Sequence, residues 1–170
     1  ASHIALECAL QAQPNVCLIS EEVEAKEMTL NDVVEHIVDV IVERANAGLN
    51  FGTILIPEGL IEFIPAMRVL IQELNDMLAE NEEFAALEGD DAKREYVKSM
   101  LSPASCELYR SLPKGIAKQL TLDRDPHGNV MVSQIETEKL LIEMVQKRLS
   151  SRHSSRCFTF MPVMASSARA

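Results

Sequence analysis

One acidic residue stands out for the chemistry it could do, the glutamate of Pro57-Glu58-Gly59. It follows the apolar, β-branched run of residues 51–56, which predicts a buried strand. Pro57 stiffens the turn, and Gly59 lets a ligand approach the backbone closely. A carboxylate held there is suited to accept hydrogen bonds from neutral sugar hydroxyls. The same spacing fits an exposed acid in a loop, so both interpretations stay open.

Glu21 and Glu22 occupy a comparable place after the apolar run of residues 16–19. Ligands of parallel α/β sheets bind beyond the carboxyl ends of the strands, where loops and helix amino termini converge. An acidic pair at this point is nevertheless more typical of a solvated turn and a helix start. We therefore single out Glu58 alone as a candidate binding residue.

The remaining residue types give no catalytic or metal signature. The four histidines do not combine into metal-ligand spacing with a third donor, so no metal site is predicted in this chain. Phosphate-loop, dinucleotide, nucleophile-elbow and zinc-protease motifs are absent from the sequence. The residues alone lead no further than an α/β ligand-binding lobe.

Composition narrows the class of protein. The chain has 170 residues, enough for one domain or part of a larger one, and a net charge of −10. That charge repels phosphate backbones and anionic lipids, so neither a nucleic-acid nor a membrane partner is expected. Four scattered cysteines are expected to be reduced, which predicts a cytoplasmic location. The first residues, Ala-Ser-His without an initiator methionine, suggest a fragment.

The elements expected to position Glu58 alternate between helix and strand. Helices are predicted from Ser2 to Pro14, from a Thr29–Asp32 capping box to Gly48, and from Pro65 to about residue 78. The strands at 16–19 and 51–56 read as continuous apolar runs, which is typical of parallel strands covered on both faces. An α/β class with parallel strands between helices follows.

From about residue 80 onward the sequence pattern changes from alternating helix and strand to mainly helix. Residues of about 80–122 form a predicted helical insertion, with one helix capped by Ser102. Residues 130–132 could form a brief strand, and an S-x-x-E box at Ser133 and Glu136 predicts the start of a long helix. From residue 150 to residue 170 the pattern is lost, and an irregular, atypical tail is expected.

Three stretches together resemble the long form of pyrophosphate-dependent phosphofructokinase, the diphosphate:fructose-6-phosphate 1-phosphotransferases. They are ASHIALECAL at the start, ILIPEGLIEFIP around Glu58, and RDPHGNV followed by SQIETEKLL. Their order matches the family, and the resemblance runs from residue 1 to about residue 149.

The resemblance implies that residues 1–149 are the fructose 6-phosphate-binding part of a phosphofructokinase-like, Rossmann-type lobe. It also implies a glycolytic phosphotransferase that moves a phosphoryl group from pyrophosphate to fructose 6-phosphate. The family's substrate-binding glutamate lies in its P-E-G turn, which maps to Glu58. A homo-oligomer and Mg²⁺ are expected for the complete enzyme, with the metal not bound by this chain.

Departures from the family pattern limit what this chain is expected to do alone. The G-G-D-D-S pyrophosphate loop and the T-I-D-x-D motif with the catalytic aspartate occur nowhere in the sequence, so no catalytic residue is predicted. Ser20 stands where the family usually has Gly, and the last twenty residues lack the G-Y-E-G-R substrate motif. The alternative is a non-catalytic subunit or interaction module derived from the same lobe.

Overall fold

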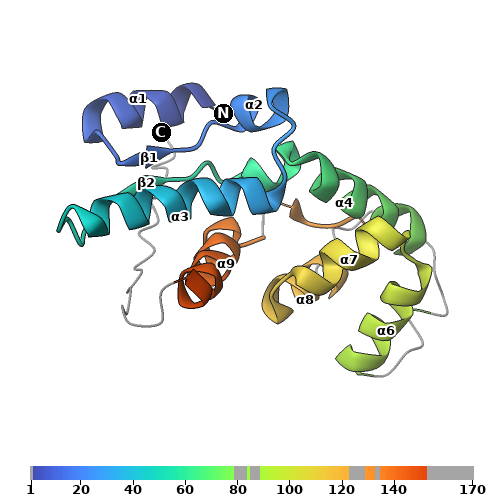
Figure 1. The fold of residues 1–170 in the computed structure, drawn as a ribbon. Helices are drawn as coiled ribbons and strands as arrows, with labels where there is room; N and C mark the ends of the chain where they lie inside the picture. The colour runs from blue at the N-terminus through green and yellow to red at the C-terminus, as the bar shows by residue number, and fades with distance from the viewer. Residues whose placement is uncertain (1, 79–83, 85–88, 123–128, 133–134, 153–170) are drawn as a thin grey trace.

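The computed structural model describes residues 2–78, 84, 89–122, 129–132 and 135–152 of the chain (Figure 1). In chain order its elements are α1 (Ser2–Ala12), β1 (Val16–Cys17), α2 (Ser20–Ala25), α3 (Leu30–Asn46), β2 (Ile54–Leu55), the 3-10 helix η1 (Leu60–Phe63), α4 (Pro65–Leu78), α6 (Asp90–Met100), α7 (Pro103–Ser111), α8 (Lys114–Leu122) and α9 (Thr137–Arg152). None of the described helices is both long and apolar enough to span a bilayer.

The two strands pair in parallel, as the sequence predicts, although each is shorter than its apolar run. Val16 pairs with Ile54 and Cys17 with Leu55. The amide of Leu18 extends the ladder by donating to the Leu55 carbonyl at 3.0 Å. Helix α1 lies on one side of this sheet and α3 on the other (Figure 1). The described chain is therefore mostly helical, with a small parallel sheet of α/β type.

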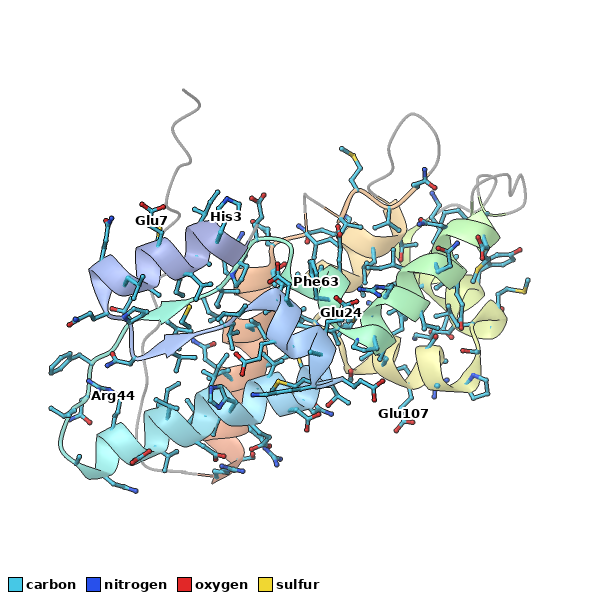
Figure 2. The ribbon with its side chains drawn as sticks, turned by 90° about the horizontal axis from the view of Figure 1, so that it is seen from above. His3, Glu7, Glu24, Arg44, Phe63 and Glu107 are labelled. Atoms are coloured by element: carbon cyan, nitrogen blue, oxygen red, sulfur yellow. The ribbon has the colours of Figure 1, made fainter. Side chains whose placement is uncertain are left out.

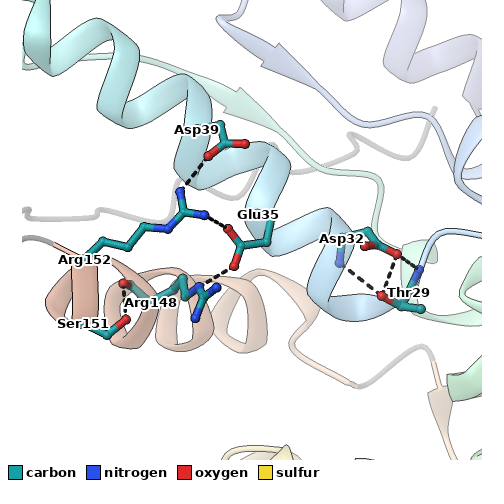
Figure 3. Close-up of polar contacts among 7 residues, drawn as sticks. All are labelled: Thr29, Asp32, Glu35, Asp39, Arg148, Ser151 and Arg152. Carbon is teal, nitrogen blue, oxygen red and sulfur yellow. Dashed lines mark hydrogen bonds and ion pairs between the residues drawn. The ribbon is translucent and has the colours of Figure 1, made fainter.

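Helix α3 begins and ends at the predicted residues. The Asp32 amide donates to the Thr29 hydroxyl at 3.2 Å, and the Thr29 amide donates to the Asp32 carboxylate at 2.8 Å, which completes the capping box (Figure 3). After the helix, Gly48 has a φ of +79°, a left-handed conformation that glycine adopts without a Cβ penalty. Local sequence signals thus determine both ends.

Helix α9 packs under α3 and connects the sheet layer to the rest of the chain (Figures 1 and 3). Four of its apolar side chains are buried, and at its far end Arg152 pairs with Glu35 at 2.5 Å and with Asp39 at 2.7 Å. Arg148 pairs with the second oxygen of Glu35. The buried apolar residues of α9 are Leu140, Leu141, Val145 and Leu149.

The remaining helices confirm the predicted helical region after α4. Helix α7 is capped as expected, because the Ser102 hydroxyl accepts from the Ser105 amide at 3.4 Å. The same hydroxyl donates to Glu73 of α4 at 2.7 Å, which ties the two helices together. Between α7 and α8, the fully buried Tyr109 hydroxyl lies 2.8 Å from that of Thr121.

Two local predictions are wrong. Residues 130–132 form no strand: Val130 makes an isolated bridge, and its amide donates to the Asn75 side chain at 2.8 Å. The long helix begins at Thr137 rather than after Ser133, which lies outside the described residues. The Glu136 carboxylate accepts from Lys139 and from Gln119. The predicted capping box itself stays a prediction, since Ser133 lies outside the described residues.

The predicted division into residues 1–149 and a tail of residues 150–170 can be compared with the structure only near residue 150. Helix α9 continues to Arg152, so residues 150–152 of the expected tail are helical. Residues 153–170 lie outside the described residues. The lobe of residues 1–149 and the atypical tail stay predictions.

The Ser20 hydroxyl, at the start of α2, is buried and has no hydrogen-bond partner among the described residues; the side chain is 1% exposed. An unsatisfied buried hydroxyl destabilises the folded state by about 1–3 kcal/mol. Ser20→Ala should therefore raise the free energy of unfolding by about 1 kcal/mol, measured by urea denaturation. Ser102→Ala is the matched control, because it removes a helix cap and should lower that free energy by about 1 kcal/mol. A loss of stability in S20A would show that the hydroxyl has a partner.

The capping box should make stability depend on pH. Hydrogen bonds from the Thr29 side chain and then from its backbone amide hold the pKa of Asp32 below its usual value. The carboxylate form therefore contributes stability above the unfolded-state pKa, and this contribution is lost as pH falls through the lower folded-state pKa. The stability gap between the wild type and Asp32→Asn should shrink between about pH 5 and pH 3. In a Thr29→Ala background this pH dependence should weaken but not vanish, because the backbone amide of residue 29 still donates to Asp32. A gap independent of pH in the wild type would contradict the account.

Candidate functional site

The Pro57-Glu58-Gly59 turn leaves β2 at its carboxyl end. Pro57 is buried, and the Leu60 amide closes the turn by donating to the Pro57 carbonyl at 3.2 Å. Leu60 and Ile61 of η1 are fully buried directly after it. The turn is thus held between a strand and an anchored 3-10 helix, while the Glu58 side chain is exposed. A carboxylate so placed is open to a ligand.

Gly59 has an ordinary backbone conformation, with φ −84° and ψ 13°. A Cβ built on it meets nothing within 4 Å. The packing of the described chain therefore gives no reason for glycine at this position. The prediction that Gly59 gives a ligand room near the backbone is compatible with this open space and stays a prediction.

A contact that sequence reasoning missed lies behind the turn. The Thr137 hydroxyl, at the start of α9, donates to the Glu58 carbonyl at 3.2 Å across a separation of 79 residues. Thr137 is 3% exposed. No local pattern indicates this contact, because it depends on how α9 packs against the rest of the chain.

Two charged residues close to Thr137 in the chain, Glu136 and Lys139, pair with each other. Lys139 hydrogen-bonds to Glu136, which lowers the pKa of the glutamate and raises that of the lysine. Both side chains are exposed to a large extent, so the pair contributes little stability.

Glu21 and Glu22 lie in the first turn of α2, beyond the carboxyl end of β1. Because β1 and β2 are parallel, this is the same edge of the sheet at which Glu58 lies. Both side chains are exposed, and Glu22 pairs with Lys26 at 2.5 Å. The hydrogen bond from Lys26 lowers the pKa of Glu22. These positions fit the solvated helix start better than a binding role.

An open cavity of about 230 Å³ lies between η1 and α4, and Glu58 does not line it. Its polar lining includes Arg68, whose guanidinium donates to Glu24 at 2.7 Å and to the Glu62 carbonyl at 3.0 Å. Glu24 and Phe63 mark the place where α2 meets η1 in Figure 2. Because the guanidinium is already paired with a carboxylate, the cavity does not present an unpaired cation to an anionic ligand.

Within the described ranges, no three histidine, cysteine, aspartate or glutamate side chains gather closely enough to hold a metal ion. Divalent cations such as Mg²⁺ require several oxygen ligands around one point. The described residues therefore offer no preformed cluster of three such side chains for a cation.

Comparison with known proteins gives strong matches over most of this chain. The pyrophosphate–fructose 6-phosphate 1-phosphotransferase of Porphyromonas gingivalis is 57% identical over 150 residues, and that of Treponema pallidum 52% over 160 residues. These matches cover 88% and 94% of this chain. The β subunit of the Solanum tuberosum enzyme is 53% identical over 152 residues. No family model matches the chain.

The matched region is a small part of each relative. It covers 27% of the Porphyromonas protein, 28% of the Treponema protein and 25% of the potato β subunit. The chain thus spans about a quarter of the length of the curated relatives it matches. Its sequence belongs, as one segment, to the pyrophosphate–fructose 6-phosphate 1-phosphotransferase family.

Proposed function

We propose that this chain is the sugar-phosphate-binding part of a pyrophosphate-dependent phosphofructokinase with a Rossmann-type lobe. Glu58 is the substrate-binding residue, and the reaction phosphorylates fructose 6-phosphate to fructose 1,6-bisphosphate in glycolysis. The observation that carries the proposal is the exposed carboxylate at the carboxyl end of β2, in a segment 57% identical to a relative of that name.

Charge decides which end of the substrate Glu58 would contact. A carboxylate repels the 6-phosphate, whereas it accepts hydrogen bonds well from neutral hydroxyls. Such charge-assisted bonds are shorter and stronger than neutral ones. Glu58 therefore orients the hydroxyls of the fructose ring, and a positively charged group elsewhere is needed for the phosphate.

The phosphoryl-transfer step itself needs groups that this sequence lacks. Positioning and charge stabilisation supply most of the rate of such reactions, through metal ions, aligned phosphates and a base for the attacking hydroxyl. The family's pyrophosphate and catalytic-aspartate motifs are missing from the sequence. Mg²⁺ and pyrophosphate would thus be bound by other parts of the complete enzyme.

The complete enzyme is proposed to be a cytoplasmic oligomer. Relatives from potato are named as β and α subunits, at 53% and 39% identity to this chain. These names support an assembly of subunits, and a homo-oligomer is the simplest form consistent with the resemblance.

Glu58 can be tested in a chimeric enzyme in which residues 1–149 replace the matched quarter of the Porphyromonas relative. Glu58→Ala in this chimera should lower kcat/KM for fructose 6-phosphate roughly 30-fold, because a charged hydrogen bond is lost. This factor corresponds to a loss of about 2 kcal/mol of transition-state stabilisation. The KM for pyrophosphate should not change. Steady-state kinetics with each substrate varied in turn measure both effects.

Glu62→Ala is the matched control, since it removes another exposed carboxylate four residues later. It should leave both KM values near those of the parent chimera. Unchanged kinetics in Glu58→Ala would reduce Glu58 to an exposed loop acid. A chimera without activity would show that this segment does not do the work of its counterpart.

The 170-residue chain by itself should be inert. Supplied with pyrophosphate, Mg²⁺ and fructose 6-phosphate, it should form no fructose 1,6-bisphosphate, because it lacks the groups that align the phosphates. An aldolase-coupled assay, with the chimera as the positive control, measures this. Turnover above the blank would contradict the division of roles proposed here.

A further inference from the structure

We propose that Thr137 is a positioning residue, which holds the Glu58 turn in the orientation that binds the sugar. The inference rests on the proposed function of Glu58 and extends it to a second element, α9. It is carried by the hydrogen bond from the buried Thr137 hydroxyl to the Glu58 carbonyl at 3.2 Å.

The neighbouring hydrogen bonds direct the Thr137 hydroxyl toward the turn. A hydroxyl has one proton to donate. The Ile135 carbonyl lies 3.3 Å from the hydroxyl, but it already accepts from the Thr137 amide at 2.7 Å. The Glu58 carbonyl is the nearer acceptor for the hydroxyl. The hydroxyl hydrogen is thus within reach of the Glu58 carbonyl, which is the longer-range of its two acceptors in sequence.

Helix α9 can serve as a rigid support for this contact. Its buried side chains pack against the core, and Arg152 and Arg148 bind it to Glu35 and Asp39 of α3 (Figure 3). Thr137 starts this helix, so its backbone moves with the whole element. The hydrogen bond from Thr137 thus restrains the Glu58 turn from outside the turn itself.

The contact acts on the peptide unit that directs Glu58. On one side, the Leu60 amide bonds to the Pro57 carbonyl and closes the turn. On the other, Thr137 restrains the peptide plane that follows the Glu58 Cα. An exposed side chain on a restrained backbone loses less freedom when it binds a ligand, and this lowers the cost of binding. Removal of the restraint should weaken sugar binding without touching the sugar.

The first test uses the chimeric enzyme and Thr137→Val, which keeps the shape and removes the hydroxyl. The KM for fructose 6-phosphate should rise about threefold to tenfold, as for one lost neutral hydrogen bond, while the KM for pyrophosphate stays unchanged. Thr137→Ser should restore the parent value. Thr121→Val is the matched control: it removes a buried, hydrogen-bonded hydroxyl in α8 and should lower the melting temperature without raising either KM.

A double-mutant cycle separates the inference from the proposed function. If Thr137 acts through Glu58, Thr137→Val in a Glu58→Ala background should add less than twofold to the KM for fructose 6-phosphate. A full additional effect would overturn the inference and leave the role of Glu58 intact. If Glu58→Ala alone has no effect, the proposed function fails, and any rise in T137V would then show that Thr137 does not act through Glu58.

A second measurement on the 170-residue chain tests the contact directly. The Leu60 amide should exchange with deuterium about threefold to tenfold faster in T137V than in the wild type, and Thr137→Ser should return it to the wild-type rate. Thr121→Val should not accelerate it beyond the change in global stability. Equal exchange in T137V and the wild type would show that the hydroxyl does not hold the turn, whatever the chimera shows.

Discussion

The parallel pairing of β1 with β2 fixes where the Glu58 turn lies in the fold. Parallel strands cannot be joined by a tight turn, so the chain must cross over between them, and it does so through α2 and α3. The pairing brings both carboxyl ends to one edge, where the turn with Glu58 leaves the sheet. Burial of Pro57, Leu60 and Ile61 then holds the turn while the carboxylate stays exposed.

Helix α9 connects this edge to the opposite side of α3. Its far end is held by charged pairs with Glu35 and Asp39, and its start reaches the Glu58 carbonyl through Thr137. The charged pairs are partly exposed and each contributes little to stability, so the buried apolar residues of α9 do most of the anchoring. The same helix thus serves the packing of the lobe and the geometry of its candidate site.

Local sequence signals were sufficient for the ends of several helices. The Thr29–Asp32 capping box, Gly48 and the Ser102 cap each act within a few residues of themselves, so their effect can be read without knowledge of the fold. Strand lengths could not be predicted, because a strand ends where its partner does. The predicted strand at 130–132 failed because the Val130 amide bonds to Asn75, which is 55 residues away in sequence.

The candidate site likewise has features that local sequence predicts and features that depend on packing. The turn chemistry of Pro57-Glu58-Gly59 follows from three consecutive residues, and the role proposed for Glu58 comes from the resemblance to a known family. The support from Thr137 depends on the packing of α9 and has no signature in sequence. The predicted start of α9 also lies too early along the chain, since Ile135 and Glu136 precede the helix that begins at Thr137.

The most direct test of the central claim is a crystal structure of the chimeric enzyme with fructose 6-phosphate bound. We expect a Glu58 carboxylate oxygen within about 2.5–3.2 Å of a ring hydroxyl, with the Glu58 carbonyl still bonded to Thr137. A sugar bound elsewhere, with the Glu58 carboxylate facing solvent, would contradict the account.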